Sequence, residues 1–567
     1  MSDETTGLGP QALGQSDRRT FIKRGAFSAG AVALGIDTRS GRKRTLVKSG
    51  AASDQPNILT IIVDQLRAPV WMPASAPFAS VMPNLAALAS KSVVFERHYT
   101  AANDCSPARS VLLTGLHTHQ TGCMVTGASW LDPRFPTWGT MLRDVGYHTA
   151  YYGKWHLNPN PRASLEQYGF SGGTYPSPNG GPGQGYEKDP KIAEQFIEWL
   201  HSEGGQTPWA STVSFVNPHD LAWWYRFTER IAAEAYPAQR AEALPPNYET
   251  PETLEEKGKP LLQRSLQKTA ATSFGAVPFL GAEAVVGWTQ MMDTYLLLQE
   301  YVDEQIGRVV HALAEHPRIA AKTVIVFTSD HGEYGGSHGM RGKGASAYEE
   351  ATRVPLYVYD PRRKLTTATA TPRTQLTSSA DITALMLTIG TGSDAWRQEA
   401  AFSQIAQRAD IAAICADPSA PGREWVLHAT DEDVTEFAEE EHAADAPRHV
   451  VAIRTPTAKL VLYSNWAAGS IETLTAGQES EFYEYTTEEG QLELTSQVGY
   501  DPPAKEQLRQ TLDTDAIPNE LRQTLPSRLA PARKQGMADY LSVERYETEK
   551  DVESRQPSAP EPTPEPL

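Results

Sequence analysis

Four short apolar runs in this chain each end in polar residues, and this recurrence constrains the fold more than any other feature. The runs are 57–63, 148–152, 211–216 and 323–328, and helical patterns separate them. Such alternation predicts βαβ units and a largely parallel sheet flanked by helices. In open α/β sheets, ligands bind beyond the carboxyl ends of the strands. Each ending alone fits a simple turn, but four together predict one site at that edge of the sheet.

The residues at these endings are of types that bind metals or anions. They are Asp64-Gln65 after the first run, Gly153 to His156 after the second, Asn217 to Asp220 after the third and Ser329 to Gly332 after the fourth.

Composition excludes several classes of protein. The chain has 51 Lys and Arg against 69 Asp and Glu, a net charge of −18, so it lacks the basic excess that a nucleic-acid partner requires. Its 40% hydrophobic content is that of a globular protein, and no apolar run reaches the ~20 residues of a membrane-spanning helix. Three cysteines are too few for a disulfide-stapled scaffold.

The later part of the chain has a different pattern. Residues 424–428 and 449–464 are typical of strands with alternating faces, and a helix is expected over 504–524. We therefore expect a smaller C-terminal α+β domain at 416–540, with an antiparallel sheet plus helix, after a larger α/β domain at 53–415.

Two acidic segments lack the apolar residues that a core needs. Residues 541–567 are acidic and then rich in proline, which predicts a disordered tail. The run 431–441 is strongly acidic and fits a solvated loop, with a cation site as the alternative.

The N-terminus resembles a twin-arginine export signal. Arg18-Arg19-Thr20-Phe21-Ile22-Lys23 precedes a small apolar run over 25–36 that is too short to span a membrane. We expect residues 1–52 to be a leader read by the twin-arginine translocation machinery, and the protein to be exported (periplasmic, cell-envelope or secreted). That route moves folded proteins, which suits an enzyme modified or metallated before export. The alternative is a disordered basic leader on a cytoplasmic protein.

The segment from Cys105 to Gly115 is the most specific in the chain. Pro107 fits the first turn of a helix, where its missing N–H costs nothing. Cys105 then lies at the helix N-terminus, where free N–H groups and the helix dipole favour an anion. The residues alone leave two interpretations open: a thiolate nucleophile and a buried structural cysteine.

The wider pattern resembles the sulfatase family. Cys105-Ser106-Pro107-Ala108-Arg109 is similar to the family signature Cys-x-Pro-x-Arg, and Gly146 to His156 resembles the second signature. Further family motifs follow in family order, and any one is weak while the ordered set is specific. They are Val63-Asp64-Gln65, Asn217 to Asp220, Asp330-His331-Gly332, His338 to Lys343, and Glu481 to Tyr485. The resemblance covers about 55 to 530 and implies an alkaline-phosphatase-like fold with a large mixed, mostly parallel sheet.

The resemblance implies a modified nucleophile. A separate formylglycine-generating enzyme would oxidise Cys105 to formylglycine (3-oxoalanine). One hydroxyl of the aldehyde hydrate, held by a divalent cation, would attack the sulfur of a sulfate ester. The second hydroxyl would lose its proton as the aldehyde reforms and sulfate leaves, a route that a plain serine lacks.

The implied activity is hydrolysis of a sulfate monoester of a small molecule or glycan. One alternative is a phosphonate monoester or phosphodiester hydrolase that uses the same centre. A catalytically silent binding protein for sulfated glycans is another.

The resemblance also implies a set of metal ligands. They are Asp64, Gln65, the hydrate at Cys105, Asp330 and His331. Many sulfatases have aspartate where Gln65 stands and asparagine where His331 stands, and this departure resembles the choline-sulfatase and phosphonate-monoester-hydrolase branches. Ca²⁺ is expected from family frequency, with Mn²⁺ close behind because an imidazole weakens the case for an oxygen-only site.

Five further residues are expected around the sulfate. They are Arg109, Lys154, His156, His219 and Lys343. In the family the matching arginine braces the formylglycine, the lysines grip sulfate oxygens, and the histidines stabilise or protonate the leaving oxygen. Because a chain of charge −18 repels anions at long range, an anion site needs local cations. Phosphonate monoester hydrolases tend to lack the Lys-x-His pair, so Lys154 and His156 favour a sulfatase.

Two other groups leave alternatives open. Trp223, Trp224 and Tyr225 fit either an aromatic wall for the organic part of the substrate or core packing. Cys123 and Cys415 are candidates to pair after export, although nothing in the sequence places them close together.

Overall fold

The computed structural model describes residues 55–69, 72–205, 208–226, 238–369, 371–432, 442–467, 469–494 and 502–554. The expected export leader (1–52), residues 433–441 of the acidic run and the end of the expected tail (555–567) lie outside the described residues. Among the residues that are described, no helix has the length and apolar character needed to cross a membrane.

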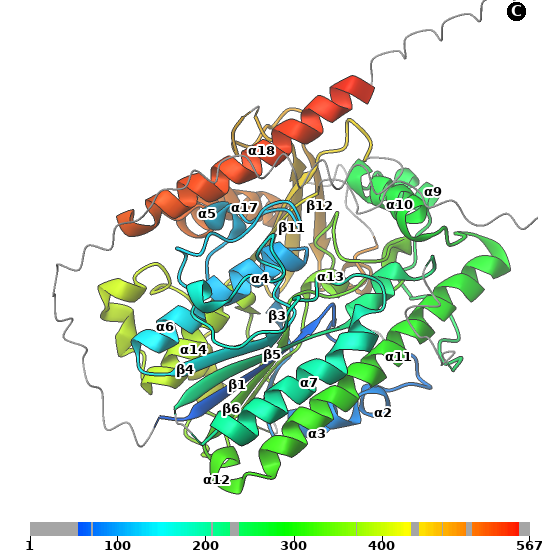
Figure 1. Cartoon of the computed structure of the whole chain (residues 1–567). Helices are drawn as coiled ribbons and strands as arrows, with labels where there is room; N and C mark the ends of the chain where they lie inside the picture. The colour runs from blue at the N-terminus through cyan, green and yellow to red at the C-terminus, as the bar shows by residue number, and fades with distance from the viewer. Residues whose placement is uncertain are drawn as a thin grey trace, which may run out of the picture. The chain divides into compact units, whose positions relative to one another are not determined.

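A six-stranded sheet forms the larger part of the fold (Figure 1). Its order is β2-β7-β6-β1-β5-β4, in which β6, β1, β5 and β4 run parallel, β7 is antiparallel to β6, and β2 is antiparallel to β7. The strands are β1 (Asn57–Asp64), β2 (Val93–Phe95), β4 (His148–Gly153), β5 (Trp209–Pro218), β6 (Thr323–Ser329) and β7 (Leu356–Tyr359). All four predicted strands are confirmed, and so is the mixed, mostly parallel sheet.

The central strand β1 is buried on both faces. Leu59, Ile61 and Val63 enter one core, whereas Ile58 and Ile62 enter another, because successive side chains point to opposite faces of a strand. Fully burying each such side chain contributes roughly 1.5–3 kcal/mol. The first core includes helices α3 (Pro83–Ala89), α7 (Gln184–Glu203) and α11 (Gly281–Ala314), and the second includes α6 (Trp138–Asp144), α14 (Ile382–Thr391) and α15 (Ile411–Ala416). Helices α7 and α11 lie side by side over the sheet (Figure 1).

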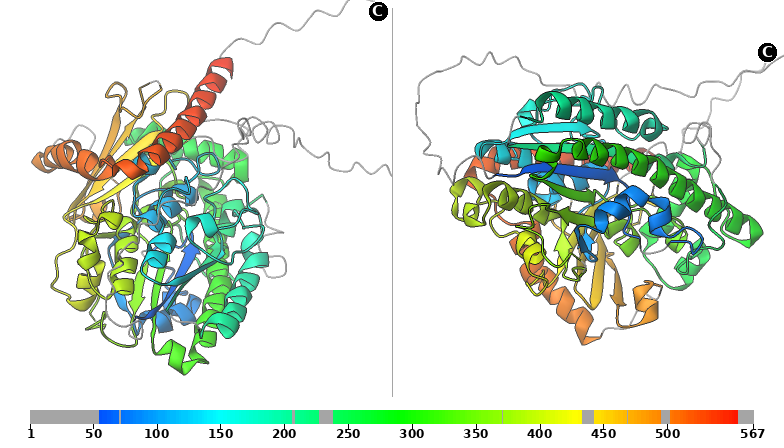
Figure 2. Two further views of the ribbon diagram at one scale, coloured as in Figure 1. Left: turned by 60° about the vertical axis from the view of Figure 1, so that its left-hand side comes forward. Right: turned by 90° about the horizontal axis from the view of Figure 1, so that it is seen from below.

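A second sheet is antiparallel and has the order β12-β11-β10-β9 (Figure 2). Its strands are β9 (Val426–Asp431), β10 (His449–Arg454), β11 (Ala458–Ser464) and β12 (Glu479–Glu484). One face packs against α17 (Pro503–Thr511) and its helical continuation over Leu512–Leu521. The expected antiparallel sheet plus helix is therefore confirmed, while the boundary between the domains 53–415 and 416–540 stays a prediction.

Two expectations about acidic segments need correction. Helix α18 (Ala530–Ser554) continues through residues 541–554, where a disordered tail was expected. Its first half is anchored because Tyr540 is buried against Met124 and Val125, and the following Glu- and Lys-rich residues favour continuation of the helix. Asp431, expected in a loop, is instead the last residue of β9.

The cysteines do not form a disulfide. Cys105, Cys123 and Cys415 are all free and buried. Cys123 and Cys415 lie in the same apolar core, and burial raises the pKa of the Cys123 thiol to about 12. The suggested pairing of Cys123 with Cys415 is therefore not observed.

Candidate active site

The carboxyl ends of the four parallel strands meet at one edge of the main sheet. Asp64 ends β1, Asp330 follows β6, His219 follows β5 and Lys154 follows β4. Because β6, β1, β5 and β4 are neighbours in this order, residues far apart in the sequence are brought to one place.

Helix α4 (Cys105–Thr114) directs its N-terminus at this edge. It begins at Cys105, as Pro107 predicts, and the Ser106 N–H donates to Oγ1 of Thr126 at 3.2 Å. Arg109 lies one turn further along the same face of the helix. The helix therefore presents both residues of the Cys-x-Pro-x-Arg pattern to the strand ends.

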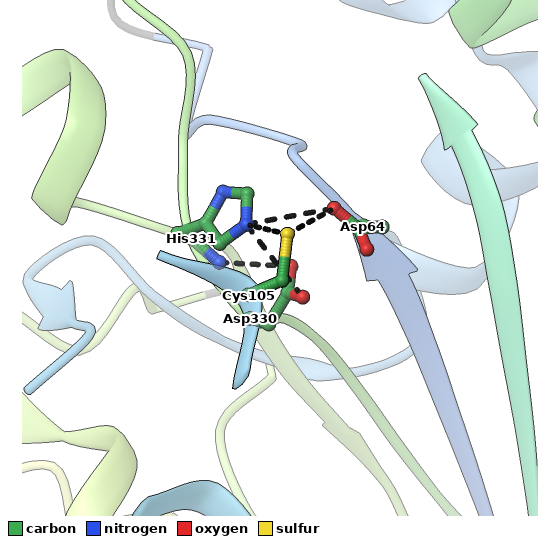
Figure 3. A group of neighbouring side chains, drawn as sticks. All are labelled: Asp64, Cys105, Asp330 and His331. Atoms are coloured by element: carbon green, nitrogen blue, oxygen red, sulfur yellow. Dashed lines mark hydrogen bonds and ion pairs between the residues drawn. The ribbon is translucent and has the colours of Figure 1, made fainter. Parts of the chain in front are cut away.

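Four buried side chains converge here and point toward one another (Figure 3). The candidate ligand atoms of Asp64, Cys105, Asp330 and His331 all lie within 4.8 Å of one another. Nε2 of His331 is 3.2 Å from Sγ of Cys105 and 3.5 Å from Oδ1 of Asp64. Two carboxylates and an imidazole are a donor set that suits a divalent cation, and buried carboxylates need cations nearby.

Arg109 forms ion pairs with both carboxylates of this four-residue group. Its guanidinium lies 2.9 Å from Oδ2 of Asp64 and 2.9 Å from Oδ2 of Asp330, and it donates to the Lys154 carbonyl and to Oγ of Ser214. Burial raises the pKa of Asp64, but Lys154, His219 and Arg109 lower it below its ordinary value despite the opposing charge on Cys105. Arg109 therefore offsets the charge of both carboxylates, although burial and the charge of Asp64 raise the pKa of Asp330.

Replacing Arg109 with alanine is expected to lower the free energy of unfolding by about 3–5 kcal/mol, because the buried Asp330 loses its Arg partner and Asp64 keeps only Lys154 and His331. Arg109→Lys keeps the charge but loses the planar fork, so an intermediate loss is expected. Denaturant unfolding measures both. The control is Arg134→Ala, which removes an exposed ion pair with Asp132 worth about 1 kcal/mol or less. Equal losses in Arg109→Ala and Arg134→Ala would contradict the role of Arg109.

Two buried lysines lie beside Cys105. Nζ of Lys154 is 2.5 Å from Oδ2 of Asp64 and 3.5 Å from Sγ, and Nζ of Lys343 donates to the side-chain oxygen of Gln65 at 2.8 Å. Burial raises the pKa of the Cys105 thiol, but Lys154, Lys343 and the nearby histidines lower it well below its ordinary value. The site therefore stabilises negative charge at residue 105.

Gln65 lies beside the predicted metal ligands, because its backbone N–H donates to Oδ1 of Asp330 at 3.2 Å, and two further residues hold its side chain. Its amide oxygen accepts from Lys343, and its amide nitrogen donates to Glu333. Its backbone has φ 64°, a left-handed conformation that is uncommon outside glycine and recurs at functional sites. Glu333, which sequence reasoning missed, also accepts from the N–H groups of Gly335 and Gly342. The only signal for it is its place directly after the Asp330-His331-Gly332 motif.

A cavity of about 150 Å³ opens above residue 105. Cys105, His156, His219 and Lys343 line it, whereas Arg109 is buried beneath. Burial and the charges of Lys154 and Lys343 lower the pKa of His219 to about 4. Gly180 backs this region with φ +92°, and a Cβ there would lie 2.6 Å from the His219 ring.

The three residues of the predicted aromatic wall lie in three different environments. Trp223 lines the cavity, and its indole N–H donates to the carbonyl of Gly180. Trp224 is buried in the main core, and Tyr225 is 57% exposed. Sequence reasoning missed several residues of the lining: Asp104, Asn179, Phe274 and Glu432.

Comparison with known proteins decides the family. The family model for Sulfatase matches residues 56–392, more than half of the chain. The chain belongs to the sulfatase family. All the residues predicted for the site lie within the matched range, whereas the second sheet lies beyond it.

Relatives and solved structures agree with this assignment. The uncharacterized sulfatase YidJ of Escherichia coli is 27% identical over 340 residues, which is 54% of this chain and 63% of YidJ, less than two thirds of its length. The multifunctional alkaline phosphatase superfamily protein PehA of Trinickia caryophylli is 30% identical over 362 residues, 54% of this chain and 68% of PehA. The phosphonate monoester hydrolase SpPMH of Silicibacter pomeroyi superposes with a TM-score of 0.60 at 21% identity, covering 84% of this chain and 97% of SpPMH. This sulfatase-family member thus has the expected alkaline-phosphatase-like fold.

Proposed function

We propose that this chain hydrolyses a sulfate monoester, with formylglycine made from Cys105 as the nucleophile and a divalent cation, Ca²⁺ or else Mn²⁺, as cofactor. The observation that carries the proposal is the position of residue 105. It lies at a helix N-terminus beside Asp64, Asp330 and His331 and near the buried ammonium groups of Lys154 and Lys343.

Asp64, Asp330 and His331 would hold the cation, with residue 105 as a further ligand. When bound, such a cation polarises an oxygen and helps to generate a nucleophile at neutral pH. The aldehyde hydrate supplies two hydroxyl groups, one for attack on sulfur and one for release of the sulfate. Maturation by a formylglycine-generating enzyme is part of this proposal.

The chain's own cations account for sulfate binding. Lys154 and Lys343 offset the charge of the sulfate oxygens in a site screened from water, where such interactions are strongest. A bound sulfate in turn offsets the charges of the two lysines that lower the pKa of His219. His219 is then better able to hold a proton beside the leaving oxygen, and His156, which also lines the cavity, is the second candidate for this role.

The second candidate function is phosphonate monoester or phosphodiester hydrolysis by the same centre. The imidazole of His331 among the metal ligands favours it, whereas the Lys154-x-His156 pair favours a sulfatase. Parallel kinetics on 4-nitrophenyl sulfate and a phenyl phosphonate monoester separate the two. We expect kcat/KM to be at least about tenfold higher for the sulfate, a difference of ~1.4 kcal/mol in transition-state stabilisation. A higher value for the phosphonate would refute the first proposal in favour of the second.

Export through the twin-arginine route stays a prediction. Its support is the order of the arginine pair, Phe21 and the apolar run in the leader.

A further inference from the structure

The C-terminal helix α18 packs against the lining of the active-site cavity. It lies beyond the range that the family model matches, so the match assigns it no role. Its neighbours are the short helix α5 (Thr118–Thr121) and the loop over residues 122–129, called here the cavity loop (Figure 1). Val125 and Thr126 of this loop line the cavity that also holds Cys105. The helix therefore contacts the active site from behind one of its walls.

The closest contact between α18 and this wall is made by glycine backbones. A Cβ on Gly536 would lie 2.0 Å from the carbonyl oxygen of Thr121, and a Cβ on Gly122 would lie 2.2 Å from the carbonyl carbon of Gly536. Both distances are far shorter than a van der Waals contact. Glycine inside a helix is otherwise destabilising relative to alanine. The close packing against the cavity loop therefore explains Gly536, whereas helix stability does not.

Tyr540 lies one turn further along the same face of α18, because it is four residues from Gly536. Its ring is fully buried in a small apolar cluster with Val125 of the cavity loop. Its hydroxyl donates to Oδ1 of Asp431 at 3.1 Å and accepts from Nε1 of Trp466 at 2.6 Å. Asp431 lines the cavity as well. Tyr540 therefore contacts two separate parts of the lining.

The cavity loop is linked in turn to the helix that carries Cys105. Oγ1 of Thr126 accepts from the N–H of Ser106 at 3.2 Å, in the first turn of α4. The Ser129 hydroxyl accepts from the N–H of Val125 at 2.7 Å and donates to its carbonyl at 3.1 Å, which closes the loop on itself. Because close-packed interiors transmit strain, a shift of the loop at α18 would reach both the cavity and the start of α4.

The Asp431 side chain has its orientation set by contacts in the described structure. Nδ1 of His449 and Nε1 of Trp466 each lie 3.0 Å from its Oδ1, beside the Tyr540 hydroxyl. The side chain is only 5% exposed, so neighbouring side chains and not solvent determine its position. Loss of the Tyr540 hydroxyl alone leaves two of these contacts. We therefore expect a partial effect from Tyr540→Phe and a larger one from Tyr540→Ala, which also empties the apolar cluster.

We propose that α18 is a positioning element of the active site. Gly536 and Tyr540 set the position of the cavity loop and of Asp431, and so the shape of the part of the cavity that receives the alcohol half of the substrate. Neither Gly536 nor Tyr540 is among the residues that line the cavity, so both act through their neighbours. The inference rests on the proposed function for the choice of assay substrate.

The kinetic test measures kcat and KM of matured variants on 4-nitrophenyl sulfate, well below their melting temperatures. We expect Gly536→Ala and Tyr540→Ala each to raise KM at least about tenfold with a smaller change in kcat, and Tyr540→Phe to raise it about threefold. Lys534→Ala, at an exposed position of the same helix, is the matched control and should leave both constants unchanged.

A merely structural role of α18 predicts a different result. The melting temperature would fall in Gly536→Ala and Tyr540→Ala while KM stayed at the value of the unchanged protein, and this outcome would overturn the inference. If neither of these variants folds, Tyr540→Phe decides, because it keeps the buried ring. An unchanged KM in Tyr540→Phe would then overturn the inference as well.

Hydrogen exchange separates this inference from the proposed function, because it needs no turnover. Mass spectrometry should find that the amides of residues 122–129 exchange at least about tenfold faster in Tyr540→Ala and at an unchanged rate in Lys534→Ala. Unchanged exchange in Tyr540→Ala would overturn the inference even if 4-nitrophenyl sulfate is hydrolysed. Faster exchange in a chain without any sulfatase activity would support the link between α18 and the cavity loop and refute the proposed function.

Discussion

Replacing Cys105 with alanine is expected to abolish hydrolysis of 4-nitrophenyl sulfate, with a loss on the order of 10⁶-fold in kcat, the scale seen when a hydrolase loses its nucleophile. The position of residue 105 explains this expected loss. Residue 105 is the reactive side chain to which α4, Lys154 and His331 all point. The fold should persist, because the Arg109 ion pairs with Asp64 and Asp330 do not depend on the sulfur. Circular dichroism and thermal unfolding check the fold beside the kinetics.

Cys415→Ala is the matched control for this variant. It makes the same chemical change in a buried thiol of the apolar core, away from the cavity lining. We expect it to lose stability by roughly 1 kcal/mol or more through the small cavity it leaves, and to keep its kcat. An inactive Cys415→Ala protein with a normal fold would show that the assay responds to loss of any thiol.

Mass spectrometry of the peptide that contains residue 105 tests the modification itself. Formylglycine is about 18 Da lighter than cysteine, since CH₂SH becomes CHO. Lys154 and Lys343 lower the pKa of the Cys105 thiol, which favours the thiolate in an unmodified side chain, so the unmodified cysteine is the rival nucleophile that this measurement must exclude. A fully active protein whose residue-105 peptide carries only the SH group would refute the formylglycine mechanism. An active Cys105→Ala protein would refute it as well.

The sequence predicts those parts of the site whose positions follow from the order of neighbouring parallel strands. Asp64, His219 and Asp330 each come directly at or after a strand end, and parallel strands place such residues at one edge. Cys105 was predictable for a local reason, since Pro107 defines the first turn of α4. Neither inference needs side-chain detail.

Other features depend on contacts that no local pattern encodes. The amide of Gln65, a residue with a left-handed backbone, contacts Lys343 and Glu333. The acidic part of the cavity lining, Asp431 and Glu432, comes from the end of β9, more than 300 residues from Cys105 in the chain, and Tyr540 of α18 holds Asp431. An acidic run in a sequence fits a solvated loop equally well, so only the packing distinguishes the two.

Removing divalent cations is expected to abolish turnover and to lower the melting temperature. Asp64 and Asp330 are fully buried and face His331, so loss of the cation leaves Arg109, Lys154 and His331 itself to offset two carboxylates. A cation present at a hundred times its Kd stabilises the folded state by about 2.7 kcal/mol. Chelation should therefore shift thermal unfolding downward by several degrees, and re-addition of Ca²⁺, or else of Mn²⁺, should restore both stability and rate.

The matched variants for this prediction are His331→Ala and His311→Ala. His331 is buried within the four-residue group, whereas the side chain of His311 is 78% exposed on α11. Elemental analysis of the purified proteins should find the cation reduced in His331→Ala and unchanged in His311→Ala, because ligands of a metal site act together and a surface imidazole does not. Metal content is a readout independent of activity, so it separates loss of the cation from loss of the modified residue 105. A chelated protein that keeps its full rate and its melting temperature would show that Asp64, Asp330 and His331 neutralise one another and the neighbouring cations without holding a metal.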